Sequence, residues 1–376
     1  MLKSIIIRSL YGLYSYNIDV KPGKDPYRFI TASNGYGKTT LLRMIEYLYN
    51  KDYMALSKIR FDEFDLLYED NYRISIGQKV YFTDDMESDE EGPLRIELHI
   101  ATSTGESAIW TSDDPHELDA QNLNIYLNSH PIYFIKDDRM GTQGQHEVVG
   151  RANVVQFRSF LLEMSQRINS ALIPNVINDK EKITEQEYVD EMRDLRPTIN
   201  AMLKYDIIKR NPIPEFSESN SALCRNSIEL FKSALTPDIE KNLALVATFD
   251  KIVAMYQYAN KTLEISPSFG YRFKATDDTH SILSFNELSS GERHILLINY
   301  DLLFNAPDDS LVLIDEPEMS FHLEWQGLFM ENLNKILETR DLQCVICTHS
   351  PEMFGYQWDK SVDLFELSQE YKEAGE

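Results

Sequence analysis

The stretch that decides the fold reads Ala32-Ser33-Asn34-Gly35-Tyr36-Gly37-Lys38-Thr39-Thr40. It follows the alternating run Tyr27–Thr31, which predicts a strand, and it opens Lys38–Tyr49, whose spacing predicts a helix. A phosphate-binding P-loop requires this context, because glycines let backbone N–H groups approach phosphate at a helix N-terminus. We expect the whole stretch to bind a nucleotide, with Lys38 at the β- and γ-phosphates and Thr39 on Mg²⁺. Ala32 stands where the motif usually has its first glycine.

Two carboxylates close an apolar run further along the chain. Leu311–Ile314 predicts a buried strand, and Asp315 and Glu316 follow it directly. The carboxyl ends of parallel strands form the ligand-binding edge of an open α/β sheet. We therefore expect Asp315 to hold Mg²⁺ through water, and Glu316 to orient and polarise the attacking water.

Two further motifs complete a pattern. Leu288–Arg293 precedes the acidic strand by one helix length, and His349 follows the predicted strand Cys344–Cys347. With the P-loop, they resemble the ATP-binding-cassette (ABC) superfamily, whose signature has the form LSGGQ or LSSGE. The resemblance implies that His349 contacts the γ-phosphate. It also implies that the signature residues bind the ATP held by an opposite subunit: Ser289, Ser290, Gly291 and Glu292.

The resemblance implies an α/β fold, an ABC-type P-loop ATPase head with a mixed sheet and flanking helices, split by a mostly helical insertion. We expect an N-terminal lobe at 1–155, the insertion at 156–262 and a C-terminal lobe at 263–376. In the insertion, apolar residues recur at helical spacing, and no heptad pattern is long enough for an extended coiled coil. Helices are expected around Glu185–Tyr205, Ala222–Ala234 and Ile239–Ala259, with prolines such as Pro197 interrupting them.

A narrower resemblance lies in Glu316–Gln326, after the acidic strand. This segment is similar to the ATPase heads of overcoming-lysogenization-defect (OLD) nucleases and of the Gabija, Septu, PARIS and retron anti-phage systems, with structural-maintenance-of-chromosomes heads as wider kin. It implies a regulatory ATPase that senses or scaffolds and controls an effector. Since only 27 residues follow His349, too few for a nuclease domain, we expect the effector to act in trans.

Two other functions compete with this one. The first is a DNA repair or recombination ATPase of the chromosome-maintenance type that binds DNA directly. The second is a transporter motor, but about 250 residues separate Lys38 from Ser289, more than transport cassettes have. The expected catalytic residues are Lys38, Glu316 and His349, and the expected cofactors are ATP and Mg²⁺. We expect a homodimer or higher homo-oligomer that closes around ATP.

One element of the superfamily has no clear counterpart, the glutamine of the Q-loop. The segment Lys136-Asp137-Asp138-Arg139 follows the strand predicted at Pro131–Ile135 and is the best positional candidate. The alternatives are Gln143, Gln145 and Gln156. We expect slow turnover if no side chain fills this role.

The amino-acid composition indicates which classes of binding partner to expect. The 376 residues are 43% hydrophobic and carry a net charge of −24, with a pI of about 4.7. Protein surfaces that bind nucleic acids are usually basic. The acidity of this chain therefore disfavours DNA as a partner and favours other proteins. The acidic run 84–91 indicates a solvated loop or a docking loop.

The sequence also bears on the cellular location of the protein and on the role of its cysteines. No apolar run approaches the roughly 18 residues of a membrane span, so we expect no membrane partner and a cytoplasmic protein. Cys344 and Cys347 form a CxxC, but no second Cys/His pair completes four metal ligands, and the segment is typical of a buried strand.

Overall fold

The chain forms two compact units. The computed structural model describes residues 1–21, 25–82, 93–116, 118, 120–136, 143–173, 182–256, 258, 260–277, 280–355 and 357–374. The first unit comprises Met1–Arg139 and Phe304–Glu376, and the second comprises Met140–Leu303. These divisions differ from the boundaries predicted after residues 155 and 262. The reason is that helix α4 is continuous over Gln143–Ala171 and packs on strand β10 (Gly270–Ala275).

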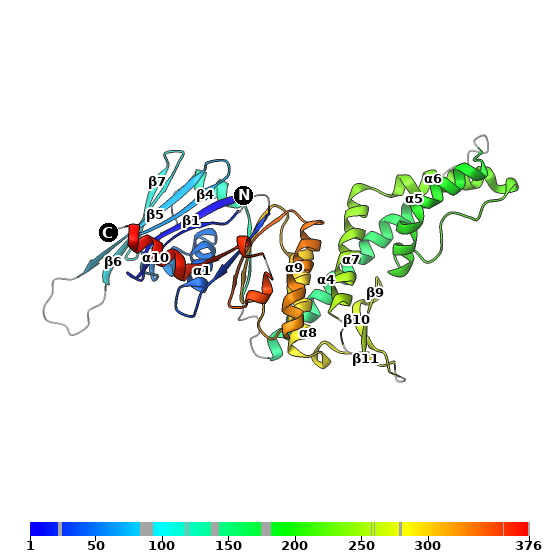
Figure 1. The fold of residues 1–376 in the computed structure, drawn as a ribbon. Helices are drawn as coiled ribbons and strands as arrows, with labels where there is room; N and C mark the ends of the chain where they lie inside the picture. Colours follow the sequence, from blue (N-terminus) through cyan, green and yellow to red (C-terminus); the bar gives the residue numbers. More distant parts are fainter. Residues whose placement is uncertain are drawn as a thin grey trace. The chain divides into compact units, whose positions relative to one another are not determined.

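Two sheets build the first unit (Figure 1). The antiparallel sheet has the order β2-β1-β4-β5-β6-β7, with β1 Leu2–Leu10, β2 Tyr14–Asp19, β4 Glu63–Tyr68, β5 Arg73–Phe82, β6 Pro93–Thr102 and β7 Ser107–Thr111. The parallel sheet has the order β14-β3-β13-β12-β8, with β14 Ser361–Asp363, β3 Tyr27–Thr31, β13 Leu342–Thr348, β12 Ser310–Asp315 and β8 Ile132–Ile135. The mixed α/β head predicted from the sequence is confirmed.

Helix α1 (Lys38–Tyr49) joins both sheets in one core. Its Leu41, Leu42 and Ile45 are fully buried in the same cluster as side chains of β1, β4, β12 and β13. Burying each such side chain contributes about 1.5–3 kcal/mol, so α1 is held firmly against the sheets. The remaining helices of this unit are α2 Tyr53–Ser57, α3 Gln121–Ser129, α9 Leu323–Leu337 and α10 Leu364–Ala374.

The parallel strands end together. Thr31 of β3 is in register with Thr348 of β13, and Asp315 of β12 is in register with Cys347 of β13. On the other side of β12, Ile314 pairs with Ile135 of β8. The residues that follow β3, β12, β13 and β8 therefore meet at one edge of the sheet, the edge where ligands bind in open α/β sheets.

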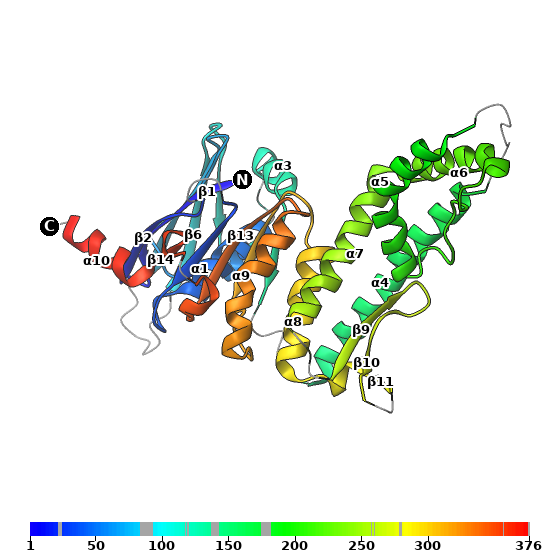
Figure 2. The same cartoon turned by 45° about the vertical axis from the view of Figure 1, so that its right-hand side comes forward.

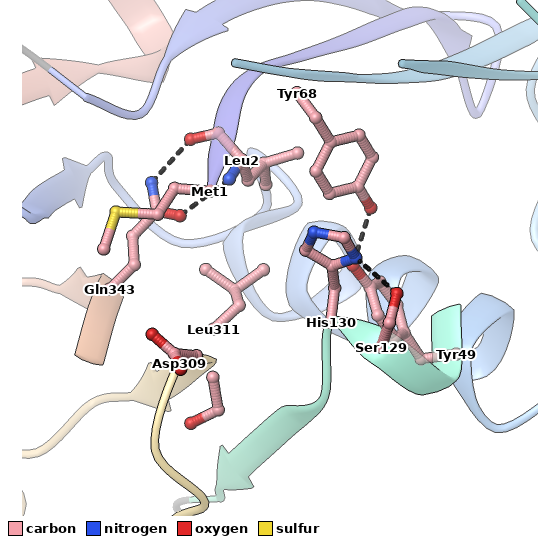
Figure 3. Close-up of a pocket in the computed structure, with 10 residues that line it drawn as sticks. Met1, Leu2, Tyr49, Tyr68, Ser129, His130, Asp309, Leu311 and Gln343 are labelled. Atoms are coloured by element: carbon pink, nitrogen blue, oxygen red, sulfur yellow. Dashed lines mark hydrogen bonds between the residues drawn. The ribbon is translucent and has the colours of Figure 1, made fainter. Parts of the chain in front are cut away.

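The opposite edge of these strands borders a pocket of about 300 Å³ (Figure 3). Gln343 of β13 lines one wall: its Oε1 accepts from the Leu2 backbone N–H at 2.8 Å, and its Nε2 donates to the Leu2 carbonyl at 2.6 Å. The hydroxyls of Tyr49 and Tyr68 lie 2.6 Å apart on the far wall. Gln343 thus ties the two sheets together at the edge away from the P-loop.

Helices dominate the second unit (Figure 2). Besides α4, it contains α5 Glu185–Lys204, α6 Ser221–Ala234, α7 Pro237–Met255 and α8 Ser290–Tyr300, and a small sheet of β9 Lys261–Ser266, β10 and β11 Ile282–Leu283. An aromatic cluster joins α4, α7, β10 and α8 through Phe157, Phe249, Tyr271 and Tyr300. None of the helices in the described part of the chain combines the length and apolar content of a membrane span.

Proline affects these helices less than the sequence predicted. Pro197 lies inside α5 without ending it, although a proline in a helix interior removes one backbone hydrogen bond. Pro237 occupies the first turn of α7. Backbone N–H groups in the first turn of a helix have no acceptor within the helix, so the lack of an N–H in proline costs no hydrogen bond there. Thr184 caps α5 with a reciprocal capping box to Glu187, which sets the start of that helix.

Candidate functional site

The P-loop lies at the carboxyl edge of the parallel sheet, between β3 and α1. Gly35 and Gly37 adopt positive φ angles of 92° and 83°. At Gly37, a Cβ would lie 2.8 Å from Leu10 Cδ2, so either the Leu10 side chain or the loop would have to move, and the positive φ would strain any other residue. Gly37 is also the N-cap of α1 and provides no side-chain cap. The first N–H groups of α1 are therefore suited to phosphate oxygens.

Lys38 is buried beneath this loop and meets the two other residues predicted to be catalytic. Its Nζ donates to the Ala32 carbonyl at 2.8 Å and lies 3.0 Å from His349 Nε2. The same Nε2 lies 2.9 Å from Glu316 Oε1. Burial lowers the pKa of Lys38, and nearby acidic groups offset part of that effect. A bound phosphate would supply the negative charge that such a desolvated ammonium favours.

The acidic turn after β12 is tightly constrained. Asp315 ends the strand and is buried, and Glu316 has a left-handed φ of 47°. The Glu316 N–H donates to the Cys347 carbonyl at 2.9 Å, which ties the turn to the neighbouring strand β13. A non-glycine residue in this backbone region costs about 1–3 kcal/mol and is common at functional sites. The turn thereby directs the Glu316 carboxylate towards His349 and Lys38.

A third carboxylate, Glu318, supports the histidine. Its Oε1 accepts a hydrogen bond from the His349 backbone N–H at 2.6 Å. Its Oε2 is buried and has no hydrogen-bond partner in the parts of the chain that the structure describes. Glu318 therefore holds the loop that carries His349 through a single carboxylate oxygen.

The residues at this edge fit a magnesium ion bound with a nucleotide. Thr39 lies half-buried in the first turn of α1, and Asp315 provides a carboxylate at the end of β12. Mg²⁺ usually takes one or two protein oxygens together with substrate phosphates and water. Over the described ranges there is no cluster of three His, Cys, Asp or Glu side chains that would hold a metal alone. A site completed by phosphate matches this donor set.

The signature segment belongs to the second unit. Ser289 caps α8: its Oγ accepts from the Glu292 backbone N–H at 3.2 Å, and its own N–H donates to Glu292 Oε2 at 2.6 Å. The other carboxylate oxygen of Glu292 lies 2.7 Å from Lys261 Nζ. Ser289 and Ser290 are exposed, whereas Gly291 and Glu292 are buried. The two serines can reach a second molecule, and the Glu292 side chain is engaged inside its own unit.

The CxxC residues lie within strand β13. Cys344 and Cys347 are free, fully buried thiols. Burial raises the pKa of Cys344 to about 12 and that of Cys347 well above its ordinary value. Because the thiolate is the reactive and metal-binding form, these side chains are packing residues of the sheet.

Sequence comparison decides the family. A profile described as the AAA ATPase domain matches residues 1–354. The chain belongs to this family. The AAA ATPase domain thus covers nearly the whole chain.

Individual relatives of this ATPase domain are distant. Over 68 residues, the chain is 32% identical to a "Probable iron chelatin transport ATP-binding protein" of Helicobacter pylori strain 26695, and equally to that of strain J99. The match covers 18% of this chain and 26% of each relative, so the chain spans about a quarter of their length.

Solved structures similar to this ATPase domain include Smc heads. One is the Pyrococcus furiosus Smc head with an extended coiled coil bound to the C-terminal domain of ScpA, at 13% identity, a TM-score of 0.41 and full coverage of both chains. Another is the Thermotoga maritima SMC head, at 9% identity and a TM-score of 0.36, covering 96% of this chain and 92% of that one.

Several predicted features of the ATPase domain fall outside the described residues. These include the Q-loop candidates Asp137, Asp138 and Arg139 and the acidic run 84–91. Gln143 and Gln145 begin α4, but their side chains are not described. Gln156 is exposed on the same helix. The identity of the Q-loop residue stays a prediction.

Three residues at the motifs were not found from the sequence. Glu318 supports His349, and Lys261 pairs with Glu292. The Tyr11 hydroxyl lies 3.3 Å from Thr40 Oγ1, on a turn where Ser9, Tyr11 and Gly12 all have positive φ. Only Glu318 had a sequence signal, since it lies two residues after Glu316. The other two depend on long-range packing.

Proposed function

We propose that this protein binds Mg-ATP and hydrolyses it across a symmetric dimer. The observation that carries the proposal is the cluster of Lys38, His349 and Glu316, which the sheet brings within hydrogen-bonding distance from three separate segments. An ammonium, an imidazole and a carboxylate beside a P-loop form an arrangement suited to phosphoryl transfer to water.

Each residue has a distinct role in the proposed reaction. Lys38 neutralises charge that develops on the β- and γ-phosphates, and His349 donates a hydrogen bond to the γ-phosphate. Glu316 orients the attacking water and accepts its proton. Thr39 and Asp315 would hold a Mg²⁺ ion, which would supply positive charge to offset that of the phosphates. Catalysis then comes from positioning and electrostatics, with no covalent step on the protein.

The dimer supplies the remaining contacts. Ser289 and Ser290 are exposed at the N-terminus of α8, a helix end that attracts anions. In the proposed dimer, these serines and the Gly291 N–H close on the ATP bound by the P-loop of the other subunit. Such an interface is isologous, with two identical sites related by a two-fold axis. ATP then holds the subunits together, and hydrolysis releases them.

The Glu316→Gln variant tests the proposed catalysis. It keeps the shape of the side chain but cannot accept a proton. We expect ATP binding to persist, turnover to fall ~10²–10⁴-fold, and the ATP-bound dimer to last longer. Phosphate release and light scattering measure these effects. Unchanged turnover in this variant would refute the assigned role of Glu316.

We further propose that the ATPase regulates a prokaryotic anti-phage system and controls a separate effector, such as a nuclease, in trans. The motif resemblance after β12 and the net charge of −24 support this proposal, since an acidic surface favours protein partners over DNA. The test is a pull-down of Glu316→Gln protein with ATP from cells that carry its native gene neighbourhood. A stoichiometric protein partner with little DNA is expected. Bound DNA without a protein partner would favour the repair-type ATPase instead.

A further inference from the structure

The P-loop carries an aromatic residue between its two left-handed glycines. Tyr36 lies between Gly35 and Gly37, and its backbone carbonyl accepts a hydrogen bond from the Tyr16 hydroxyl at 2.8 Å. Tyr16 is a buried residue of β2, and burial raises the pKa of its hydroxyl, so it stays a neutral donor. The loop is thus anchored to the antiparallel sheet through its main chain.

The Tyr36 ring contacts two other aromatic rings. The Tyr14 ring of β2 lies at a centroid distance of 5.2 Å. The Phe365 ring of α10 packs edge-on at 5.8 Å. Both distances fall in the range in which aromatic pairs stabilise each other beyond simple burial. The side chain of Tyr36 is therefore a packing group.

The C-terminal helix is itself fixed to the strand that leads into the P-loop. Strand β14 pairs with β3, with Asp363 in register with Thr31, the last residue of β3. The Asp363 carboxylate accepts from the Phe365 N–H at 2.7 Å at the start of α10. Helix α10 then packs against β2. The position of Phe365 beside Tyr36 is therefore set by strand β14, which pairs with β3, and by the packing of α10 on β2.

We propose that α10 is part of the nucleotide site, with Phe365 and Tyr16 as positioning residues that hold the P-loop in its phosphate-binding conformation through Tyr36. This inference rests on the proposed ATP binding and extends it to the C-terminal helix. Phe365 is 47% exposed, so it contributes little to the hydrophobic core, and a structural role in folding does not account for its position. Without this contact the free P-loop would sample more conformations, so ATP binding would cost more conformational entropy.

The test separates nucleotide affinity from turnover in Phe365→Ala. We expect the Kd for a fluorescent ATP analogue and the KM for ATP to rise roughly three- to tenfold, the range of one aromatic contact. The kcat at saturating ATP should stay within about twofold, because ATP restores the loop conformation once bound. Phe365→Tyr keeps the ring and should restore wild-type affinity.

Two controls and a second variant complete the test. Glu366→Ala changes the neighbouring exposed residue of α10, and Trp358→Ala removes an exposed aromatic that packs on Phe354 instead. Both should match the wild type. Tyr16→Phe removes only the hydroxyl that binds the Tyr36 carbonyl, and it should weaken ATP binding in the same way if Phe365→Ala proves unstable.

The outcomes distinguish this inference from the function beneath it. Wild-type ATP affinity in both Phe365→Ala and Tyr16→Phe would overturn the inference and leave the ATPase proposal standing. A fall in kcat with unchanged KM would also overturn it. Failure of the wild-type protein to bind ATP would remove both.

Discussion

The ammonium of Lys261 lies 2.7 Å from Oε1 of Glu292, and this contact sets the conformation of the signature turn. Glu292 Oε2 accepts from the Ser289 N–H, so one carboxylate links strand β9 to the residue that caps α8. Tyr258 adds a buried hydrogen bond from its hydroxyl to the Glu292 carbonyl at 2.9 Å. The sequence motif predicted that Glu292 binds nucleotide. The geometry favours a positioning role for its side chain.

Lys261→Met should disturb this turn while leaving the P-loop intact. Leaving the Glu292 carboxylate without its cation should cost about 1–3 kcal/mol in the stability of the second unit. We expect turnover to fall about 10–100-fold through misplacement of Ser289, with little change in the Kd for ATP. Thermal unfolding and steady-state kinetics measure both effects.

A matched control is available one strand away. Lys274 of β10 pairs more loosely with Glu264, at 3.7 Å, and Lys274→Met should leave turnover unchanged. Adding Glu292→Gln to Lys261→Met removes the unpaired charge and should recover most of the lost stability. Equal loss of turnover in Lys261→Met and Lys274→Met would contradict a specific role for Lys261.

Glu318→Ala should slow hydrolysis through His349. The variant removes the acceptor of the His349 backbone N–H, a contact of 2.6 Å. Losing one such hydrogen bond costs about 1 kcal/mol or more. If this cost raises the activation free energy of hydrolysis, kcat should fall about fivefold to tenfold at unchanged ATP affinity. Glu318→Gln retains an acceptor oxygen and should lose less. Glu324→Ala, an exposed residue of α9, is the control.

Gly37→Ala should weaken nucleotide binding more than it weakens the fold. A left-handed alanine costs about 1–2 kcal/mol, and the added Cβ would also meet Leu10. The displaced loop should raise the Kd for ATP about tenfold or more. Gly105→Ala has a similar φ of 89° in open space, and it should lose stability without changing the Kd. Equal Kd values in the two variants would count against the P-loop geometry described above.

Local patterns predicted much of the fold. The P-loop context predicted a helix over Lys38–Tyr49, which is the extent of α1. The strand predicted at Cys344–Cys347 lies within the buried strand β13, Leu342–Thr348. These elements follow from short-range periodicity and burial on both faces. The helical insertion was predicted to begin at residue 156, whereas helix α4 begins at Gln143. The pattern did not indicate this earlier start, because Gln143–Gly150 contains two glycines and no clear apolar period.

The long-range contacts of the site were beyond the sequence. Lys261 and Glu292 are 31 positions apart, and so are Glu318 and His349. No periodicity relates such pairs, because their proximity depends on how strands and helices pack. The grouping of β9, β10 and α8 with the helical insertion had the same cause. The order and spacing of residues in the sequence identified the motifs. The packing of strands and helices in the structure was needed to identify the residues that support them.

The central claim is that each active site is shared between two subunits, and mixing two inactive variants tests it most directly. Lys38→Ala removes the P-loop cation, and Ser289→Arg blocks the signature turn. In a mixed dimer, one site pairs an intact P-loop with an intact signature. Equal mixing should therefore restore about a quarter of wild-type ATPase activity, although each variant alone is inactive. A mixture that stays inactive at every ratio, or full activity in Ser289→Arg alone, would contradict the shared site.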